Sequence, residues 1–342
     1  MSTGYVYDPV FLKHDLRGHP ENAQRLVRVT RLLEETGTLA RLTAVQARDV
    51  SADELAWNHT PDYVAQVRSV AERGGGHLDL DTYVGVDSYA AASKAAGGLI
   101  DLAAAVLEGR LDNGFGLVRP PGHHALRGRG MGFCLFNNVA LAAYAALEAH
   151  GLERVLIVDF DVHHGNGTQD SFDEDPRVLY FSTHQYPHYP GTGHWQEIGR
   201  GEGQGTTANV PLPHGVGDAG FSLIFEDFLW LLAERYRPQL ILVSAGYDAH
   251  WADPLAGIQL SVTGYAQLAR SLKSLAEALC DGRIVFTLEG GYNLDVLAYG
   301  VLNTFKVLLG DGEIVDPLGP APRREQPVDD LVEHLKGVHR LV

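Results

Sequence analysis

The chain has 342 residues, of which 45% are apolar and 20% charged, in the range of an ordinary globular enzyme. Its formal net charge of −16 argues against a nucleic-acid partner, whose phosphates require a basic surface, and would attract cationic partners at long range. Two cysteines, Cys134 and Cys280, are too few for a disulfide framework in a chain of this size.

Residues 1–15 contain no cationic start followed by an apolar stretch, so a signal peptide is not predicted. No segment approaches the roughly 20 apolar residues that cross a bilayer, and we expect no membrane partner. The low cysteine content favours a cytoplasmic protein. No linker, charge block or fixed-period repeat divides the chain, and a single catalytic domain over residues 1–342 is predicted.

Helix-like and strand-like segments alternate along the chain. Pro20 and Glu21 are typical of a helix start, and Gly37 of a helix end. Helices with apolar residues at three- and four-residue spacing are predicted over residues 22–35, 88–107, 138–150, 219–236 and 262–279. Short apolar runs between them predict buried strands at residues 116–118, 155–158, 178–181, 240–243 and 284–288. The segment 311–326, rich in proline and glycine, is expected to wrap the surface. Such alternation implies an α/β fold, with helices on both faces of a parallel sheet.

Four of the predicted strands are followed by unusual polar runs. Ligands of open parallel sheets bind beyond the carboxyl ends of the strands, where such runs would meet at one edge. The runs cover residues 119–124, 159–167, 244–248 and 289–292, and they contain histidines, aspartates and a tyrosine.

The densest of these runs contains Asp161 and His163. Residues two apart in an extended chain project to the same side, so both side chains can reach one metal ion. Asp248, from another strand end, would be a third ligand. One histidine nitrogen and two carboxylates suit zinc, with a position left open for water and substrate. The alternative is that Asp161 and His163 only cap a helix and form hydrogen bonds with a loop. The presence of Asp248 and of the two adjacent histidines argues against this alternative.

His123 and His124 are adjacent, so their side chains diverge and are poorly arranged to share that metal. Two imidazoles beside a metal suit proton transfer near neutral pH. Gly290 and Gly291 allow the backbone to approach a ligand closely, and the hydroxyl of Tyr292 could donate to a developing oxyanion. A packing role is the alternative for this tyrosine.

Taken together and in this order, the motifs resemble the histone deacetylase and acetylpolyamine amidohydrolase superfamily. The matching stretches are residues 119–125, 132–138, 159–167, 244–248 and 289–293, with weaker similarity at 19–21 and 59–63. The resemblance implies a three-layer αβα open parallel sheet related to the arginase fold. It also implies a zinc-dependent deacetylase that hydrolyses the amide of acetyl-lysine, or of related acylated amines, to acetate and a free amine.

The resemblance assigns one zinc ion to Asp161, His163 and Asp248. His124 would act as general base and then as general acid, and His123 would be its electrostatic partner.

The resemblance also assigns supporting roles around these residues. Tyr292 would polarise the amide oxygen. Asp159 would orient His123 and would join Ser182 around a structural potassium or sodium ion. Asn166, a catalytic-site residue, stands where the other large branch of the superfamily carries an aspartate, so the chain is similar to the class II branch.

A narrow tunnel for the acyl-lysine stem is implied as well. Gly132 and Phe133 would form one wall of it and Tyr189 the other. Leu255 would lie near the mouth, where polyamine-selective relatives carry an acidic residue. Acetylated lysine side chains are therefore the first candidate substrates and acetylated polyamines the second. These motifs leave open whether the chain forms a homo-oligomer.

Two further readings have a different chemistry. Dimanganese ureohydrolases carry an Asp-x-His-x-Asp run, but here glycine, Gly165, stands at the last position of the run that begins at Asp161. A catalytically inactive acyl-lysine binding module would not need Tyr292 and both histidines. These two readings are therefore the remote alternatives.

Overall fold

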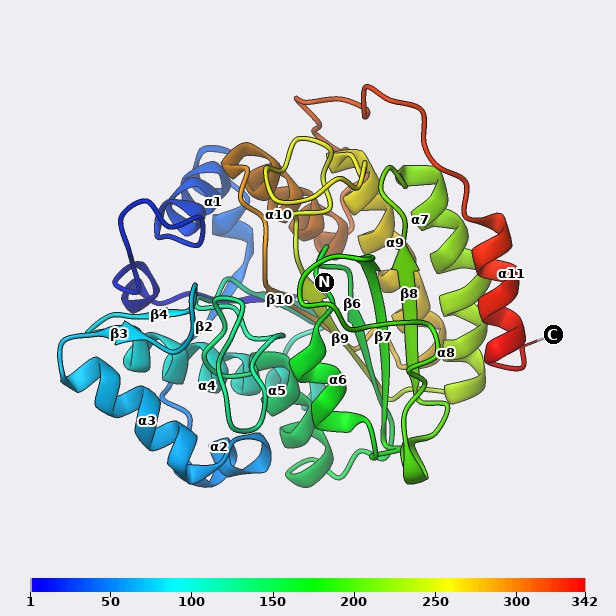
Figure 1. The fold of residues 1–342 in the computed structure, drawn as a ribbon. Coiled ribbons are helices and arrows are strands. Elements are labelled where there is room, and N and C mark those ends of the chain that lie inside the picture. Colours follow the sequence, from blue (N-terminus) through cyan, green and yellow to red (C-terminus); the bar gives the residue numbers. More distant parts are fainter. Residues whose placement is uncertain (1, 342) are drawn as a thin grey trace.

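The computed structural model describes residues 2–341, which surround one eight-stranded parallel sheet with helices on both faces (Figure 1). The strand order is β2-β1-β5-β10-β9-β6-β7-β8, and every neighbouring pair is parallel. The strands are β1 (Thr3–Val6), β2 (Thr43–Val45), β5 (Asn113–Gly116), β6 (Val155–Asp159), β7 (Val178–Gln185), β8 (Thr207–Leu212), β9 (Leu240–Ala245) and β10 (Ile284–Leu288). The predicted three-layer α/β fold is confirmed.

Two groups of helices cover the sheet. On one face, α4 (Ser88–Leu107) and α5 (Asn138–Glu148) pack on the strands and on each other. On the other face, α9 (Val262–Leu279) and α10 (Leu294–Leu309) do so, with α1 against α10. The remaining helices are α1 (Gln24–Glu35), α2 (Ala52–Asn58), α3 (Pro61–Glu72), α6 (Asn166–Phe172), α7 (Asp218–Ile224), α8 (Trp230–Tyr236) and α11 (Asp329–Val338), and β3 (Gly76–His77) pairs with β4 (Tyr83–Val84) in a small antiparallel ladder.

The helix expected over residues 22–35 begins later, at Gln24. The Asn22 side chain accepts a hydrogen bond from the Gln24 amide at 2.9 Å, and Glu21 is drawn into a fully buried ion pair with Arg119. Asn22 therefore precedes the first regular turn, although its carbonyl accepts a hydrogen bond from the Arg25 amide at 3.2 Å.

The amphipathic segment 219–236 is helical along its length but not uniformly so. A π-helical turn at Phe225–Leu229 separates α7 from α8, so the segment is not the single regular helix that its periodicity predicted. The proline- and glycine-rich segment 311–326 contains no helix or strand and runs along the outside of the ribbon before α11 (Figure 1).

One expectation about apolar segments was wrong. Helix α4 has 20 residues and contains an 18-residue stretch with a mean hydropathy of 1.4, which makes it long and apolar enough to cross a membrane by length and composition. In the fold, however, 72% of this stretch is buried, against the sheet and α5. Its hydrophobicity is explained by burial within the protein.

The first predicted strand lies three residues earlier than expected. Its ladder ends at Gly116, and residues 117–118 are buried but already lead into the next loop. Strands β6, β9 and β10 begin where they were predicted. The four strands that precede the polar runs, β5, β10, β9 and β6, are neighbours at the centre of the sheet, so their loops meet at one edge.

Candidate active site

Three side chains from the loops after β6 and β9 converge at this edge. His163 Nδ1 lies 3.1 Å from Asp161 Oδ1 and 3.3 Å from Asp248 Oδ2. In a tetrahedral zinc site with bonds of about 2.0–2.1 Å, neighbouring ligand atoms stand roughly 3.3 Å apart. The structure thus brings together, at the spacing of metal ligands, the three residues that the sequence analysis assigned to zinc.

Asp248 supplies the clearest indication that this cluster can hold a cation. Its Oδ1 accepts a hydrogen bond from the Val162 amide at 3.0 Å, whereas its Oδ2 is buried and has no hydrogen-bond partner among residues 2–341. An unsatisfied buried carboxylate oxygen is unfavourable unless a cation or a donor meets it. A Cβ at Gly290 would lie 2.1 Å from this oxygen, so only glycine leaves that space open. The donor set therefore fits a metal ion.

The electrostatics of the cluster favour a positive charge at this point. Burial lowers the pKa of His163, but its hydrogen bond to Asp161 and the nearby charges of Asp161 and Asp248 outweigh burial and raise this pKa to about 10. A proton and a divalent metal ion compete for such a site, because a histidine ligand must be deprotonated.

His123 and His124 lie beside this cluster with their rings 4.0 Å apart, and they differ in environment. His123 Nδ1 lies 3.0 Å from Asp159 Oδ2, and His124 Nδ1 lies 2.7 Å from Asn166 Oδ1. Burial lowers the pKa of both rings. For His123 the charges of Asp159 and Asp161 reverse this effect and raise the pKa to about 10, whereas for His124 the positive His123 and His163 hold the pKa well below its usual value. The pair thus holds one charged and one neutral imidazole.

Tyr292 follows β10 and borders the same pocket. Its ring meets that of Phe133 edge-on at 5.9 Å, and the Arg25 guanidinium lies 5.2 Å from the ring centroid. Burial and the negative charge of Asp248 raise the pKa of its hydroxyl well above the usual value. The hydroxyl therefore stays protonated and able to donate at neutral pH.

A cavity of about 260 Å³ leads from the surface to these groups. Phe133 and Tyr189 both line it, as does Leu255, and the last two are 39% and 36% exposed at its mouth. A Cβ at Gly132 would lie 2.4 Å from His124 Cδ2, so the glycine allows the wall to approach the histidine. The lining residues are Asp81, Pro121, His123, His124, Gly132, Phe133, His163, His188, Tyr189, Leu255, Gly290 and Tyr292.

Asp159 and Ser182, the residues assigned to a monovalent cation, face each other in the register of β6 and β7. Both are buried, and both side chains already have protein partners. Asp159 accepts from the Tyr180 hydroxyl at 3.2 Å in addition to its contact with His123, and Ser182 Oγ lies 2.9 Å from His184 Nδ1. The structure therefore places the two residues together without identifying an ion.

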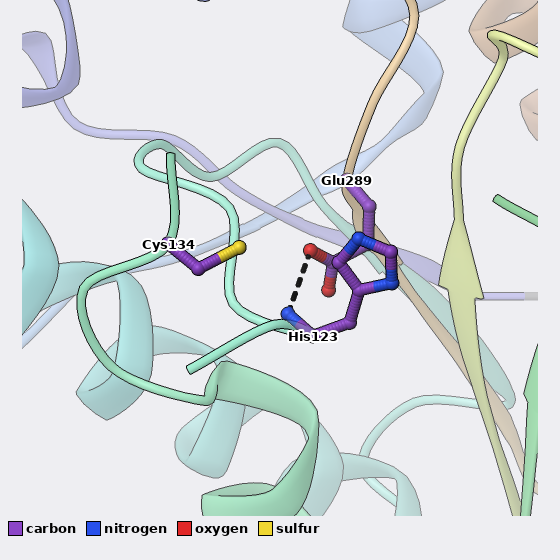
Figure 2. A group of neighbouring side chains, drawn as sticks. All are labelled: His123, Cys134 and Glu289. Carbon is purple, nitrogen blue, oxygen red and sulfur yellow. Dashed lines mark hydrogen bonds between the residues drawn. The ribbon is translucent and has the colours of Figure 1, made fainter. Parts of the chain in front are cut away.

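A second group of potential ligands lies behind the pocket: His123, Cys134 and Glu289 (Figure 2). The Glu289 carboxylate accepts hydrogen bonds from the amides of Gly122 and His123, at 2.7 and 3.2 Å. Burial and the nearby Glu289 charge raise the pKa of the Cys134 thiol well above its usual value, and its Sγ lies 3.3 Å from Gly132 O. A protonated thiol is a poor metal ligand, so we interpret this group as hydrogen-bonded structure.

Sequence reasoning missed several residues around the pocket. Glu289 carried a signal, since it directly follows a predicted strand at the same edge. No sequence pattern indicated Asp81 or His188. Asp81 lies in the turn between β3 and β4, and the ring of His188 stacks on that of His163 at 5.2 Å. Asp253 is buried and bonds to the Tyr292 amide at 2.8 Å, a contact that no local pattern indicates.

Comparison with known proteins agrees with this geometry. Residues 19–308 match the family described as the histone deacetylase domain. Histone deacetylase 14, chloroplastic, of Arabidopsis thaliana is 40% identical over 96% of this chain and 83% of its own length. A probable deacetylase of Archaeoglobus fulgidus is 40% identical over 91% of this chain and 87% of its own.

Two further matches are a human protein and a solved structure. The human polyamine deacetylase HDAC10 is 40% identical over 93% of this chain and 48% of its own length. The crystal structure of the HDA15 HD domain superposes with a TM-score of 0.90 at 36% identity, covering 99% of this chain and 94% of that one.

Proposed function

The chain belongs to the histone deacetylase family and is a deacetylase, and we propose that it is zinc-dependent and acts on acetyl-lysine side chains of polypeptides. Its products would be acetate and a free amine. The observation that carries the zinc assignment is the unsatisfied, buried Asp248 Oδ2, which converges with Asp161 on His163 Nδ1.

Asp161, His163 and Asp248 would hold the ion, beside the pocket that His163 lines. When bound, zinc supplies Lewis acidity and lowers the pKa of water. We further assign Asp159 and Ser182 to a structural monovalent cation, because they are paired across β6 and β7.

His124 is the residue that moves the proton. Its Nδ1 is engaged by Asn166, so Nε2 is the nitrogen left for the pocket, and its depressed pKa keeps that nitrogen free to accept. His124 Nε2 takes a proton from the attacking water and returns it to the leaving amine. The adjacent charged His123, held by Asp159, stabilises negative charge that develops in the transition state.

Tyr292 acts on the other side of the reacting carbonyl. Its protonated hydroxyl donates to the amide oxygen as that oxygen gains charge. The ring is held between Phe133 and Arg25, so the donor is oriented before substrate binds. Pre-orientation lowers the reorganisation needed in the transition state.

The mouth of the pocket supports a polypeptide substrate. Tyr189 and Leu255 are partly exposed there, and Leu80, next to the pocket residue Asp81, is fully exposed. Apolar side chains at this rim can be covered by residues that flank an acetyl-lysine, whereas a small amine would leave them in water. Leu255 offers no charge to a second ammonium group.

Acetylpolyamine hydrolysis is the second candidate. It is favoured by the carboxylate of Asp81 at the mouth, by the net charge of −16 and by the similarity to a polyamine deacetylase. Rates of hydrolysis of an acetyl-lysine peptide and of acetylspermidine, compared at moderate salt, distinguish the two. A tenfold or greater preference for acetylspermidine in kcat/KM would replace the peptide proposal with the second candidate.

Two expectations from the sequence stay predictions. One is that the chain forms a single catalytic domain. The other is a cytoplasmic location, since the relatives include proteins named chloroplastic.

A further inference from the structure

Two buried carboxylates lie behind the catalytic residues without lining the substrate pocket: Glu289, after β10, and Asp253, in the loop after β9. Glu289 is 0% and Asp253 6% exposed. A buried carboxylate is unfavourable unless hydrogen bonds or charges satisfy it. In both residues the satisfying donors belong chiefly to the backbone of the segments that carry His123 and Tyr292.

Glu289 contacts the segment that leads into the histidine pair. Its Oε2 accepts from the amides of Gly122 and His123, as the dashed line in Figure 2 shows for the second contact. Its Oε1 lies 3.5 Å from Ser244 Oγ. The carboxylate therefore links the ends of β9 and β10 to the backbone that presents the histidines, and it does so without touching an imidazole nitrogen.

Asp253 makes the corresponding contact to the tyrosine. Its Oδ2 accepts from the amides of Tyr292 and Asn293, at 2.8 and 3.2 Å, and its Oδ1 accepts from the Leu255 amide at 3.0 Å. One carboxylate thus joins the backbone of Tyr292 to the loop that carries the rim residue Leu255.

We propose that Glu289 and Asp253 are positioning residues, which hold the histidine pair and Tyr292 in the geometry that the reaction requires. This inference rests on the proposed function, which assigns the chemistry to His124 and Tyr292. A displacement of about 1 Å in a reacting group can lower a rate by about 100-fold. Burial raises the pKa of each carboxyl group to about 7, in Asp253 with a contribution from the charge of Asp248 and in Glu289 against the opposing charge of His123.

The hydrogen-bond patterns predict opposite outcomes for two amide substitutions. In Glu289→Gln, the side-chain carbonyl oxygen can accept from both backbone amides, and the NH2 group can donate to Ser244 Oγ. Every contact then still pairs a donor with an acceptor. In Asp253→Asn this is impossible, because both oxygens accept from backbone amides and one would be replaced by a donor.

The test measures kcat, KM, bound zinc and melting temperature of these variants and of Glu289→Leu. We expect Glu289→Gln to stay within about threefold of the native kcat, and Glu289→Leu and Asp253→Asn to lose about 10- to 100-fold. KM and bound zinc should change little. In a Tyr292→Phe background, Asp253→Asn should lower kcat by less than about threefold, because the hydroxyl that it positions is already gone.

A matched control is Asp218→Asn. Asp218 also accepts hydrogen bonds from a backbone amide and a hydroxyl, both of Ser261, but neither residue lines the pocket. This variant should lower the melting temperature with kcat unchanged. If Asp253→Asn does not fold, Asp253→Glu, which keeps both acceptor oxygens displaced by one methylene, replaces it and should lower kcat in the same way.

Two results would overturn the inference. One is a fully multiplicative loss when Asp253→Asn is combined with Tyr292→Phe, which would mean that the carboxylate acts independently of the tyrosine. The other is a loss in Glu289→Gln as large as in Glu289→Leu, accompanied by one fewer zinc ion per chain, which would make Glu289 a metal ligand. All assays use whichever of the acetyl-lysine peptide and acetylspermidine the native protein hydrolyses. Hydrolysis of neither would contradict the proposed function instead.

Discussion

Replacing Tyr292 with phenylalanine removes one hydroxyl group and leaves the rest of the site in place. The ring would still meet Phe133 edge-on and lie beside the Arg25 guanidinium, and the backbone would still be bonded to Asp253. Substrate binding should therefore change little, while the donor to the developing oxyanion is lost. Loss of one such donor typically lowers kcat by about 10²–10³, or about 2.7–4 kcal/mol of transition-state stabilisation.

The assay is a measurement of kcat and KM for Tyr292→Phe and the native protein on the same acetylated substrate. Because the pKa of the tyrosine hydroxyl is raised well above its usual value, the donating form persists from about pH 6 to pH 9. The ratio of native to variant kcat should therefore be constant over this range, with KM nearly unchanged.

Tyr144→Phe is the matched control for this experiment. The Tyr144 hydroxyl donates to Ser171 O at 2.9 Å, away from the pocket, so its loss should affect stability and not kcat. A Tyr292→Phe kcat within about threefold of native would refute the proposed oxyanion donor. A ratio that falls steeply as the pH rises toward 9 would refute the argument from the raised pKa.

Three further predictions concern the metal, the rim and the stability of the fold. Asp248→Ala should abolish retention of zinc through dialysis together with activity, and a native zinc content in that variant would contradict the ligand assignment. Leu255→Glu should raise the kcat/KM ratio of acetylspermidine over an acetyl-lysine peptide several-fold at most, because an exposed ion pair contributes only about 0–1 kcal/mol; an unchanged ratio would mean that the second ammonium group does not reach residue 255. Glu21→Gln should lower the free energy of unfolding by about 3–5 kcal/mol, because it leaves the buried Arg119 without its charge partner. The pKa of Glu21 is held well below its usual value, so its contribution is present above about pH 4.5 and is lost as the pH falls. Chemical denaturation at neutral and acidic pH should therefore show the native protein approaching the variant on acidification, and a constant difference would contradict the ion-pair argument.

The sequence by itself determined the fold class and the edge at which the site lies. Buried parallel strands such as β6 and β10 are short continuous apolar runs, and this local pattern does not depend on distant contacts. The polar runs after them had to meet, because parallel strands present their carboxyl ends at one edge. The outer strands β2 and β8 were not predicted from the sequence. Strand β2 is only three residues long and largely exposed, and strand β8 contains Pro211.

Only the tertiary structure decided which polar atoms are satisfied and which are left for a ligand. The Gly290 amide that bonds Asp161 is 129 residues away from it along the chain, and the Asp253 carboxylate reaches Tyr292 across 39 residues. Such contacts have no local signal, since their partners are set by how loops from different strands fold over one edge. The same holds for α4, whose composition suits a lipid bilayer as well as a protein core, and whose burial against the sheet decides between them.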